Sequence, residues 1–286
     1  MPRMLAVGHV TWDLRDGREV LGGSVSYAAL AAQKLGWSAG VLTSAGPDFD
    51  PAKELPGIDV FVSPAPATTR FRNVYGADGT RRQAIVARSG TPDLSVLPDA
   101  WRAPDVLLLA PVARELGPGM ALAFEAEVVG AGAQGFLREF DEDGGVSSGA
   151  WPGAARDLEG AHIVFLSEHD LADAEGRSRE LLATVPMVAL TRGWRGLHLF
   201  TRQGRHEVSS LPRPEADPTG AGDVFAAAFL LRYHETADLV EAAAFAACAA
   251  SCAVEGVGAS SLGDREEVQR RLALRERLIE DGEWDE

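Results

Sequence analysis

The sequence predicts an α/β fold with a central, mainly parallel sheet flanked by helices and a small additional β layer. Three observations lead to this prediction. Short, almost entirely apolar runs recur between helix-like segments, which is the pattern of parallel strands that are covered on both faces. Two other segments alternate polar and apolar residues around a turn, as β-hairpins do. The last third of the chain is helical, with clear breaks between the helices.

The predicted elements follow one another along the whole chain. The strands of the central sheet are expected at 5–7, 40–42, 105–110, 163–166 and 187–190. The hairpins are expected to pair 70–75 with 81–87 and 197–201 with 206–210, and the helices to cover 26–35, 220–232, 237–254 and 264–280. Because no repeat or low-complexity linker divides the chain, we expect a single domain over residues 1–286, with a lid contributed mainly by residues 59–88.

Charge and composition narrow the class of partner. The 286 residues carry a formal net charge of −15, which disfavours nucleic acid and anionic membranes as partners. No run approaches the roughly 18 apolar residues of a membrane helix, and Met1-Pro2-Arg3 leads directly into a strand-like run, so we expect a cytoplasmic protein. Lys34 and Lys53 are the only lysines, so a bound phosphate would be held by backbone amides, arginines or a metal.

The sequence gives little support for a P-loop, zinc-hydrolase or dinucleotide-binding site. Neither lysine lies in a Walker A frame, and the sequence has no H-E-x-x-H. A G-x-G-x-x-G is present at Gly130, Gly132 and Gly135. We expect a helix over 120–129 before it and a strand over 136–140 after it, which is the reverse of a dinucleotide-binding context. We therefore predict a glycine-rich turn from helix to strand.

Residues 217–223, Asp-Pro-Thr-Gly-Ala-Gly-Asp, precede a helical run and suit phosphate chemistry. Glycines let the backbone approach a ligand, and the free amides at a helix N-terminus, with the positive end of the helix dipole, form an anion hole. Asp223 lies in the first turn, where its carboxylate would be kept ionised and could accept a hydroxyl proton. A simple helix cap is the alternative role for this aspartate.

The same stretch resembles the C-terminal signature of the ribokinase-like PfkB carbohydrate kinases, D-T-x-G-A-G-D in outline, with Pro218 at a position often held by threonine. Gly22-Gly23, ahead of the helix 26–35, resembles the N-terminal glycine pair of that family. Other segments fall in the family's order: 8–13 resembles the first strand and its substrate-binding aspartate, 191–196 the T-x-G-x-x-G nucleotide loop, and 253–259 the loop beside the adenine. The resemblance covers residues 4 to 262 and implies a ribokinase-like fold.

The resemblance implies roles for individual residues. The catalytic group would be Asp223, with the anion hole formed by Gly220, Ala221 and Gly222. The acceptor would meet Asp13, Gly22, Gly23, Tyr27 and, on the lid hairpin, Asn73. ATP would meet Thr191, Gly193 and Gly196. Mg²⁺ would take a carboxylate from Asp170 or Glu168, and a monovalent cation such as K⁺, used by some members, would lie at Asp217 and Thr219.

The sequence also departs from the family pattern. The N-x-x-E motif falls at Ser167-Glu168-His169-Asp170, without its asparagine, so magnesium affinity is expected to differ. Only eight residues separate Asp13 from Gly22, so we expect a shortened lid and a monomer or weak homodimer. This short lid, together with Gln134-Gly135-Phe136-Leu137-Arg138, most resembles the cyclitol (myo-inositol) kinase-like members.

The implied activity is ATP-dependent phosphorylation of a hydroxyl on a small sugar or polyol, with a cyclitol such as myo-inositol among the acceptors. Two alternatives stay open. A ribose or nucleoside kinase of the same fold would keep the chemistry and change the acceptor. A non-catalytic sugar- or nucleotide-binding regulatory protein is supported by the altered Ser167 to Asp170 motif and opposed by the intact Asp223.

Overall fold

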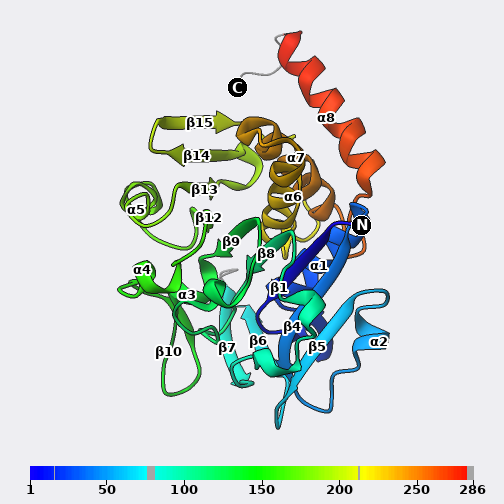
Figure 1. The fold of residues 1–286 in the computed structure, drawn as a ribbon, viewed down its shortest axis with the longest axis vertical. Helices are drawn as coiled ribbons and strands as arrows, with labels where there is room; N and C mark the ends of the chain where they lie inside the picture. The colour runs from blue at the N-terminus through cyan, green and yellow to red at the C-terminus, as the bar shows by residue number, and fades with distance from the viewer. Residues whose placement is uncertain (16, 76–80, 212, 282–286) are drawn as a thin grey trace.

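The computed structural model describes residues 1–15, 17–75, 81–211 and 213–281. Within these residues the main element is a nine-stranded sheet of order β15-β14-β13-β12-β9-β8-β1-β4-β5 (Figure 1). Seven strands are parallel: β1 (Arg3–Val7), β4 (Ser38–Ala45), β5 (Asp59–Pro64), β8 (Val106–Leu109), β9 (Val128–Gly132), β12 (Ile163–Ser167) and β13 (Met187–Thr191). The predicted second hairpin, β14 (Leu197–Thr201) and β15 (Gly204–Val208), extends one edge in antiparallel pairing. The α/β architecture predicted from the apolar runs is confirmed.

Helices cover both faces of this sheet. One face is covered by the long helices α1 (Ser24–Lys34), α6 (Ala221–Thr236) and α7 (Leu239–Ala253), with α8 (Arg265–Glu280) on the outside against α7 (Figure 1). The other face is covered by short elements: α3 (Gln134–Leu137), α4 (Ala154–Asp157), α5 (Ala174–Leu181) and the 3₁₀ turns Leu94–Val96, Asp99–Trp101 and Met120–Ala123. The remaining helical pieces are α2 (Pro51–Glu54) and the 3₁₀ turn Gly193–Arg195.

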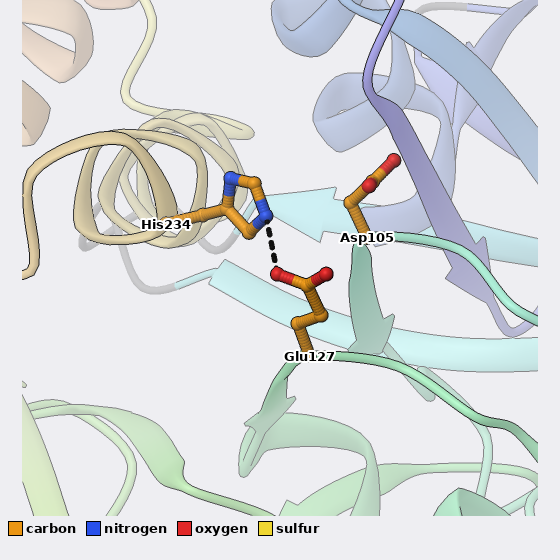
Figure 2. A group of neighbouring side chains, drawn as sticks. All are labelled: Asp105, Glu127 and His234. Atoms are coloured by element: carbon orange, nitrogen blue, oxygen red, sulfur yellow. Dashed lines mark hydrogen bonds and ion pairs between the residues drawn. The ribbon is translucent and has the colours of Figure 1, made fainter.

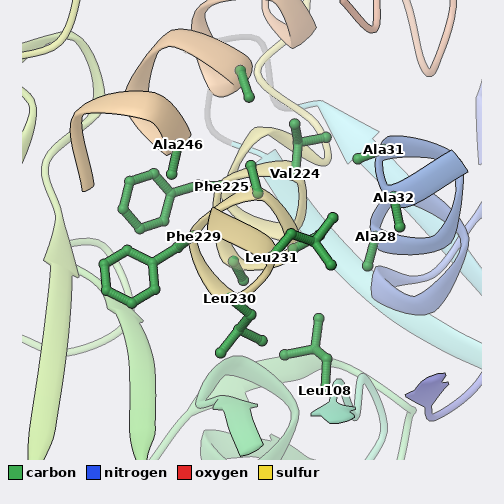
Figure 3. Packing of buried hydrophobic residues seen from close by; sticks show 14 of the residues in the cluster. Ala28, Ala31, Ala32, Leu108, Val224, Phe225, Phe229, Leu230, Leu231 and Ala246 are labelled. Carbon is green, nitrogen blue, oxygen red and sulfur yellow. The ribbon is translucent and has the colours of Figure 1, made fainter. Parts of the chain in front are cut away.

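Alternation along each strand divides the core into two layers. On β1, Met4 and Ala6 face α1 and α6, whereas Leu5 and Val7 face the short helices, and all four are buried. Helix α6 is enclosed on every side, since Phe225 and Phe229 pack toward β12 and Leu230 and Leu231 lie among α1 and the strands (Figure 3). Full burial of each such side chain contributes about 1.5–3 kcal/mol, which fixes the axis of α6 relative to the sheet.

The small β layer is larger than predicted. It is a four-stranded sheet of order β3-β2-β6-β7, made of β2 (Thr11–Arg15), β3 (Arg18–Gly22), β6 (Thr69–Tyr75) and β7 (Arg81–Ala87). The expected lid boundary was therefore wrong: residues 59–64 form β5 of the large sheet, and residues 11–22 supply half of the lid. The short spacing between Asp13 and Gly22, from which we expected a shortened lid, forms a tight hairpin that pairs Thr11 with Gly22.

The context of the glycine motif was also predicted wrongly. A strand, β9, precedes Gly135 and helix α3 follows Ala133, whereas the expected helix at 120–129 shrinks to a 3₁₀ turn and the expected strand at 136–140 to β10 (Arg138–Phe140), which pairs with β11 (Val146–Ser148). Gly135 is required because an added Cβ would lie 2.0 Å from the Pro111 carbonyl oxygen. A four-residue α3 that runs into β10 does not build the long helix of a dinucleotide site.

Among the described residues, no helix combines the length and the apolar character that crossing a membrane requires.

Candidate active site

A cavity of about 590 Å³ lies where parallel strands end. Residues that follow β8, β9, β12 and β13 form its floor, the N-terminus of α6 forms one side, and the small sheet covers it. This carboxyl edge is where open α/β sheets bind their ligands. The cavity brings together most of the predicted site residues, which are Asp13, Gly23, Tyr27, Asp170, Thr191, Gly193, Gly196, Thr219, Gly220, Ala221, Gly222 and Asp223.

Asp223 projects from the first turn of α6 into this cavity. The N-cap position of the helix is held by Gly220, with φ of 82°, and no side chain caps it. The structure therefore does not give Asp223 the cap role that the sequence had left open. Its carboxylate instead accepts a hydrogen bond from the side chain of Ser24, the first residue of α1.

Burial raises the pKa of Asp223 to about 6, and the nearby Asp170 carboxylate acts in the same direction. The Ser24 hydrogen bond and the Arg138 guanidinium lower it but do not compensate. The prediction that the helix dipole would simply keep this group ionised was thus incomplete, because desolvation is the larger effect. A carboxylate with this pKa is still mostly ionised at pH 7 and is a stronger base than an exposed aspartate.

Arg138 is a cavity residue that the site prediction missed. It stands at the start of β10, where its Nη1 donates to the Val112 carbonyl oxygen at 2.6 Å and its Cζ lies 4.8 Å from the centre of the Phe71 ring. Its charge lowers the pKa of both Asp170 and Asp223. The near-absence of lysine in the sequence already required arginine, amides or metal at a phosphate site, and this was the signal that could have found it.

One end of the cavity is lined by residues of the small sheet. Asp13 lies on β2, is buried, and accepts a hydrogen bond from Thr11 Oγ1 at 3.3 Å. Gly22 does not line the cavity, but an added Cβ there would lie 2.7 Å from Thr11 Oγ1 and 2.9 Å from Asp13 Cγ. Its role is to leave room for these two side chains.

Two further predicted acceptor contacts differ in outcome. Tyr27 lines the cavity, and its ring lies directly against Gly220, where an added Cβ would approach it to 2.3 Å. Asn73 does not line the cavity; its Oδ1 accepts from Gln83 Nε2 at 3.1 Å, and Gln83 is the residue exposed to the cavity. The lid hairpin therefore presents Phe71 and Gln83, which sequence reasoning did not single out.

The opposite end of the cavity is less polar. Thr191 ends β13, and Gly193 and Gly196 both adopt positive φ in the loop that follows. An added Cβ on Gly196 would lie 2.1 Å from the Val208 carbonyl oxygen, so this turn requires glycine. Beyond the loop the wall includes the apolar Leu197, Leu211 and Val254, with Arg213 and Glu215 also among its residues.

Of the two carboxylates considered for magnesium, only Asp170 faces the cavity. Its Oδ2 accepts from the Ser167 backbone N–H at 2.7 Å, and burial raises its pKa. Glu168 is not in the cavity wall and pairs with Arg195. Because Mg²⁺ takes oxygen ligands and retains much of its water, the Asp170 carboxylate fits a hydrated ion and Glu168 does not.

Asp217 was predicted as a cation ligand, but its carboxylate oxygens accept hydrogen bonds from backbone N–H groups. Oδ1 accepts from the Thr219 N–H at 3.0 Å, and Oδ2 from the Gly258 N–H at 3.4 Å. These bonds join the loop before α6 to the loop after α7. Thr219 lines the cavity, whereas Asp217 stands behind it.

A buried carboxylate, Glu115, connects the lid to the cavity floor. It accepts backbone N–H bonds from His9 at 2.8 Å, Val112 at 3.0 Å and Ala113 at 2.6 Å. His9 leads into β2 and Asp13, and the carbonyl of Val112 accepts from Arg138. Glu115 therefore links the segment that leads into β2 to the Val112 turn.

Comparison with known proteins agrees with this arrangement. The model of the pfkB family of carbohydrate kinases matches residues 138–265, which include the Arg138 strand, Asp170, the Thr191 loop and the whole Asp217 to Asp223 stretch. Residues 138–265 thus match the PfkB carbohydrate kinase domain. The chain is 28% identical over 121 residues to a nucleoside kinase of Methanocaldococcus jannaschii, an alignment that covers 40% of this chain and 40% of that enzyme.

Solved structures show that the chain has the ribokinase-like fold. A pyrophosphate-dependent kinase of the ribokinase family, complexed with a pyrophosphate analogue and myo-inositol, aligns with a TM-score of 0.78 at 19% identity, covering 93% of this chain and 99% of that one. The ribokinase of Thermotoga maritima aligns at 0.74 with 21% identity, covering 96% and 100%. The M. jannaschii nucleoside kinase aligns at 0.73 with 18% identity, covering 96% and 99%. The predicted family and fold are confirmed.

Proposed function

We propose that this protein transfers a phosphoryl group from ATP to a hydroxyl of a small sugar or polyol, with Asp223 as the base. The observation that carries the proposal is the position of Asp223. Its carboxylate stands in one cavity between the acceptor wall around Asp13 and the apolar pocket beyond Thr191, and burial gives it a pKa of about 6. A base with a pKa near the working pH suits proton removal from an alcohol.

Different residues of the cavity have different roles in phosphoryl transfer. Asp13 accepts a hydrogen bond from the acceptor and orients the reacting hydroxyl toward Asp223, which removes its proton. The amides of Ala221 and Gly222, at the start of α6, hold the transferring phosphoryl group. Arg138 neutralises charge on its oxygens. Mg²⁺ held through Asp170 would screen the negative charge of the donor phosphates.

For the acceptor, we propose a cyclitol such as myo-inositol. The wall near Asp223 offers Asp13, Thr11 and Gln83 as hydrogen-bonding groups and Phe71 as an apolar face, a combination that suits a ring with several hydroxyls. The ribokinase-family neighbour complexed with myo-inositol agrees with this choice. Ribose or a nucleoside is the alternative, favoured by the similarity to the M. jannaschii nucleoside kinase.

For the donor, the apolar wall of Leu197, Leu211 and Val254 favours a nucleotide, because a flat adenine ring gains from burial beside aliphatic side chains. Pyrophosphate is the alternative donor, since the same neighbour depends on it. Pyrophosphate would need the anion hole and Arg138 but would leave the apolar wall unused.

One experiment tests acceptor and donor together. Purified protein is incubated with Mg²⁺ and with either ATP or pyrophosphate, against a panel of cyclitols, pentoses, hexoses and nucleosides, and phosphorylated acceptor is detected by ³¹P NMR. We expect turnover with ATP and a cyclitol, reduced by about 10² to 10⁴ in the Asp223→Asn variant. Turnover with pyrophosphate but not with ATP would show that pyrophosphate is the donor. Binding of an acceptor without turnover under any condition would favour the non-catalytic alternative.

A further inference from the structure

At the edge of the sheet opposite the active site, three side chains with metal-binding atoms lie close together (Figure 2). Asp105 precedes β8, Glu127 precedes β9, and His234 lies in the last turn of α6. Each offers one donor atom, and all three donor atoms lie within 4.8 Å of one another. The closest pair, His234 Nε2 and Glu127 Oε2, is separated by 3.0 Å.

Neighbouring groups hold two of the three side chains in place. The backbone N–H of Arg3 donates to Asp105 Oδ2 at 2.6 Å, which fixes the plane of this carboxylate. The ring of Trp37 meets the His234 imidazole edge to face, with 5.2 Å between ring centres. Outer contacts of this kind orient metal ligands in proteins. The side chain of Glu127 is 72% exposed, so an ion and its water could enter from solvent.

The charges at this cluster call for a cation. Within the described ranges, neither Asp105 nor Glu127 makes an ion pair with lysine or arginine. The nearest arginine of α6, Arg232, pairs with Glu235 and Glu241 instead. The two carboxylates together carry a charge of about −2, which a divalent ion would balance.

We propose that Asp105, Glu127 and His234 form a binding site for a divalent transition-metal ion of the zinc type, with water completing the coordination. An imidazole nitrogen beside two carboxylate oxygens suits Zn²⁺ or Co²⁺, whereas Mg²⁺ and Ca²⁺ prefer oxygen alone. Zinc bonds of about 2.0–2.2 Å in tetrahedral geometry place donor atoms about 3.4 Å apart, so only small side-chain movements are needed. The ion would join the amino ends of β8 and β9 to the C-terminal end of α6.

The test uses the full-length protein without an affinity tag, stripped with EDTA and free of nucleotide. Co²⁺ is titrated in while its visible absorption is followed, and Zn²⁺ binding is measured by calorimetry. We expect one ion per chain, competition between the two metals, and a higher Tm with Zn²⁺. His234→Ala should weaken binding by more than about 100-fold, beyond the effect usual for an outer contact, and Glu127→Gln should weaken it less.

His206→Ala is the matched control, because His206 is an exposed histidine on β15, away from the cluster. It should bind Co²⁺ as the wild type does. Equal binding by the wild type and His234→Ala, or no stoichiometric binding by the wild type, would overturn the proposal. If His234 only forms an ion pair with Glu127, its replacement would lower the Tm by the same amount with and without Zn²⁺, and the site would be rejected even if the variant is less stable.

Discussion

The hydroxyl of Ser24, at the start of α1, hydrogen-bonds to the carboxylate of Asp223, at the start of α6. Two helix N-termini from opposite ends of the chain thus meet at the proposed base. The bond stabilises the ionised form and partly offsets the effect of burial on its pKa. Ser24 is therefore expected to set the pH at which the base becomes available.

Replacing Ser24 by alanine should raise the pKa of Asp223 further. The acid limb of the kcat/KM profile should move to higher pH, with activity above that limb largely retained. Profiles of kcat/KM between pH 5 and 9 measure this shift. Ser178→Ala, which removes a buried hydroxyl bonded to the Ala174 carbonyl, is the control and should leave the profile unchanged. An unshifted acid limb in Ser24→Ala would exclude this role.

Asp223→Asn should lower kcat by about 10² to 10⁴ while the affinities for acceptor and donor change little. Its effect on stability has a defined sign. Because the folded-state pKa is raised to about 6 from 3.8, the folded wild type binds more protons than the unfolded chain between these values and loses stability as the pH rises through them. The asparagine variant lacks this loss, so its Tm relative to the wild type should increase from pH 4 to pH 7. Near-normal turnover would refute the mechanism.

Arg138→Gln should reduce kcat/KM by about 10²-fold, because it removes the positive charge near both Asp170 and Asp223. The same change should raise the pKa of Asp223, so the acid limb should move to higher pH as well. Steady-state kinetics across pH separates the two effects. Arg88→Gln is the control, since Arg88 stacks on Phe140 close by but does not line the cavity. Equal losses in both variants would indicate a general effect on this region.

Two glycines at the start of α6 should respond in opposite ways. Gly222→Val should fold normally, because an added Cβ meets nothing within 4 Å, but should reduce turnover by occupying the space where the phosphoryl group must approach. Gly220→Ala should lower the Tm, because φ is 82° and the Cβ would meet the Tyr27 ring at 2.3 Å. Thermal melts and kcat for the pair test this contrast. Full activity in a folded Gly222→Val variant would show that the phosphoryl group does not approach the backbone at Gly222.

Glu115→Gln should cost about 1–3 kcal/mol of stability, because the amide NH₂ cannot accept the backbone N–H bonds that the carboxylate accepts. If Glu115 also positions the site, KM for the acceptor should rise as β2 and the Val112 turn move apart. Chemical unfolding and acceptor titration measure the two effects on the same variant. A loss of stability with unchanged kinetics would show that Glu115 stabilises the fold but does not position the site.

The parallel sheet could be predicted because its strands are short, wholly apolar and separated by helices. Strand β9 was missed since its sequence, Val128–Gly132, continues an apolar run that begins at Met120 and has helical character. Gly119 adopts a left-handed conformation ahead of that run, and only a 3₁₀ turn forms there. Periodicity does not separate such a helix from a buried strand.

The residues that line the cavity were predictable where one segment carries several of them, as residues 218–223 do. Ser24, Arg138 and Glu115 were missed because their roles arise from tertiary contacts with segments far away in the chain. Asn73 and Glu168 were chosen by residue type, but strand pairing turns Asn73 toward Gln83 and an ion pair engages Glu168. Side-chain direction was the missing information in each case.

Strand β2 belongs to the lid and also carries Asp13, the proposed acceptor contact. An acceptor held by Asp13 would therefore bind to the small sheet, whereas the Thr191 loop that would hold the donor extends from the large sheet. Occupancy of the acceptor subsite would thus bias the lid toward closure by itself, and the donor would meet a cleft that is already assembled. We expect an ordered kinetic scheme in which the acceptor adds first, with little hydrolysis of donor in its absence.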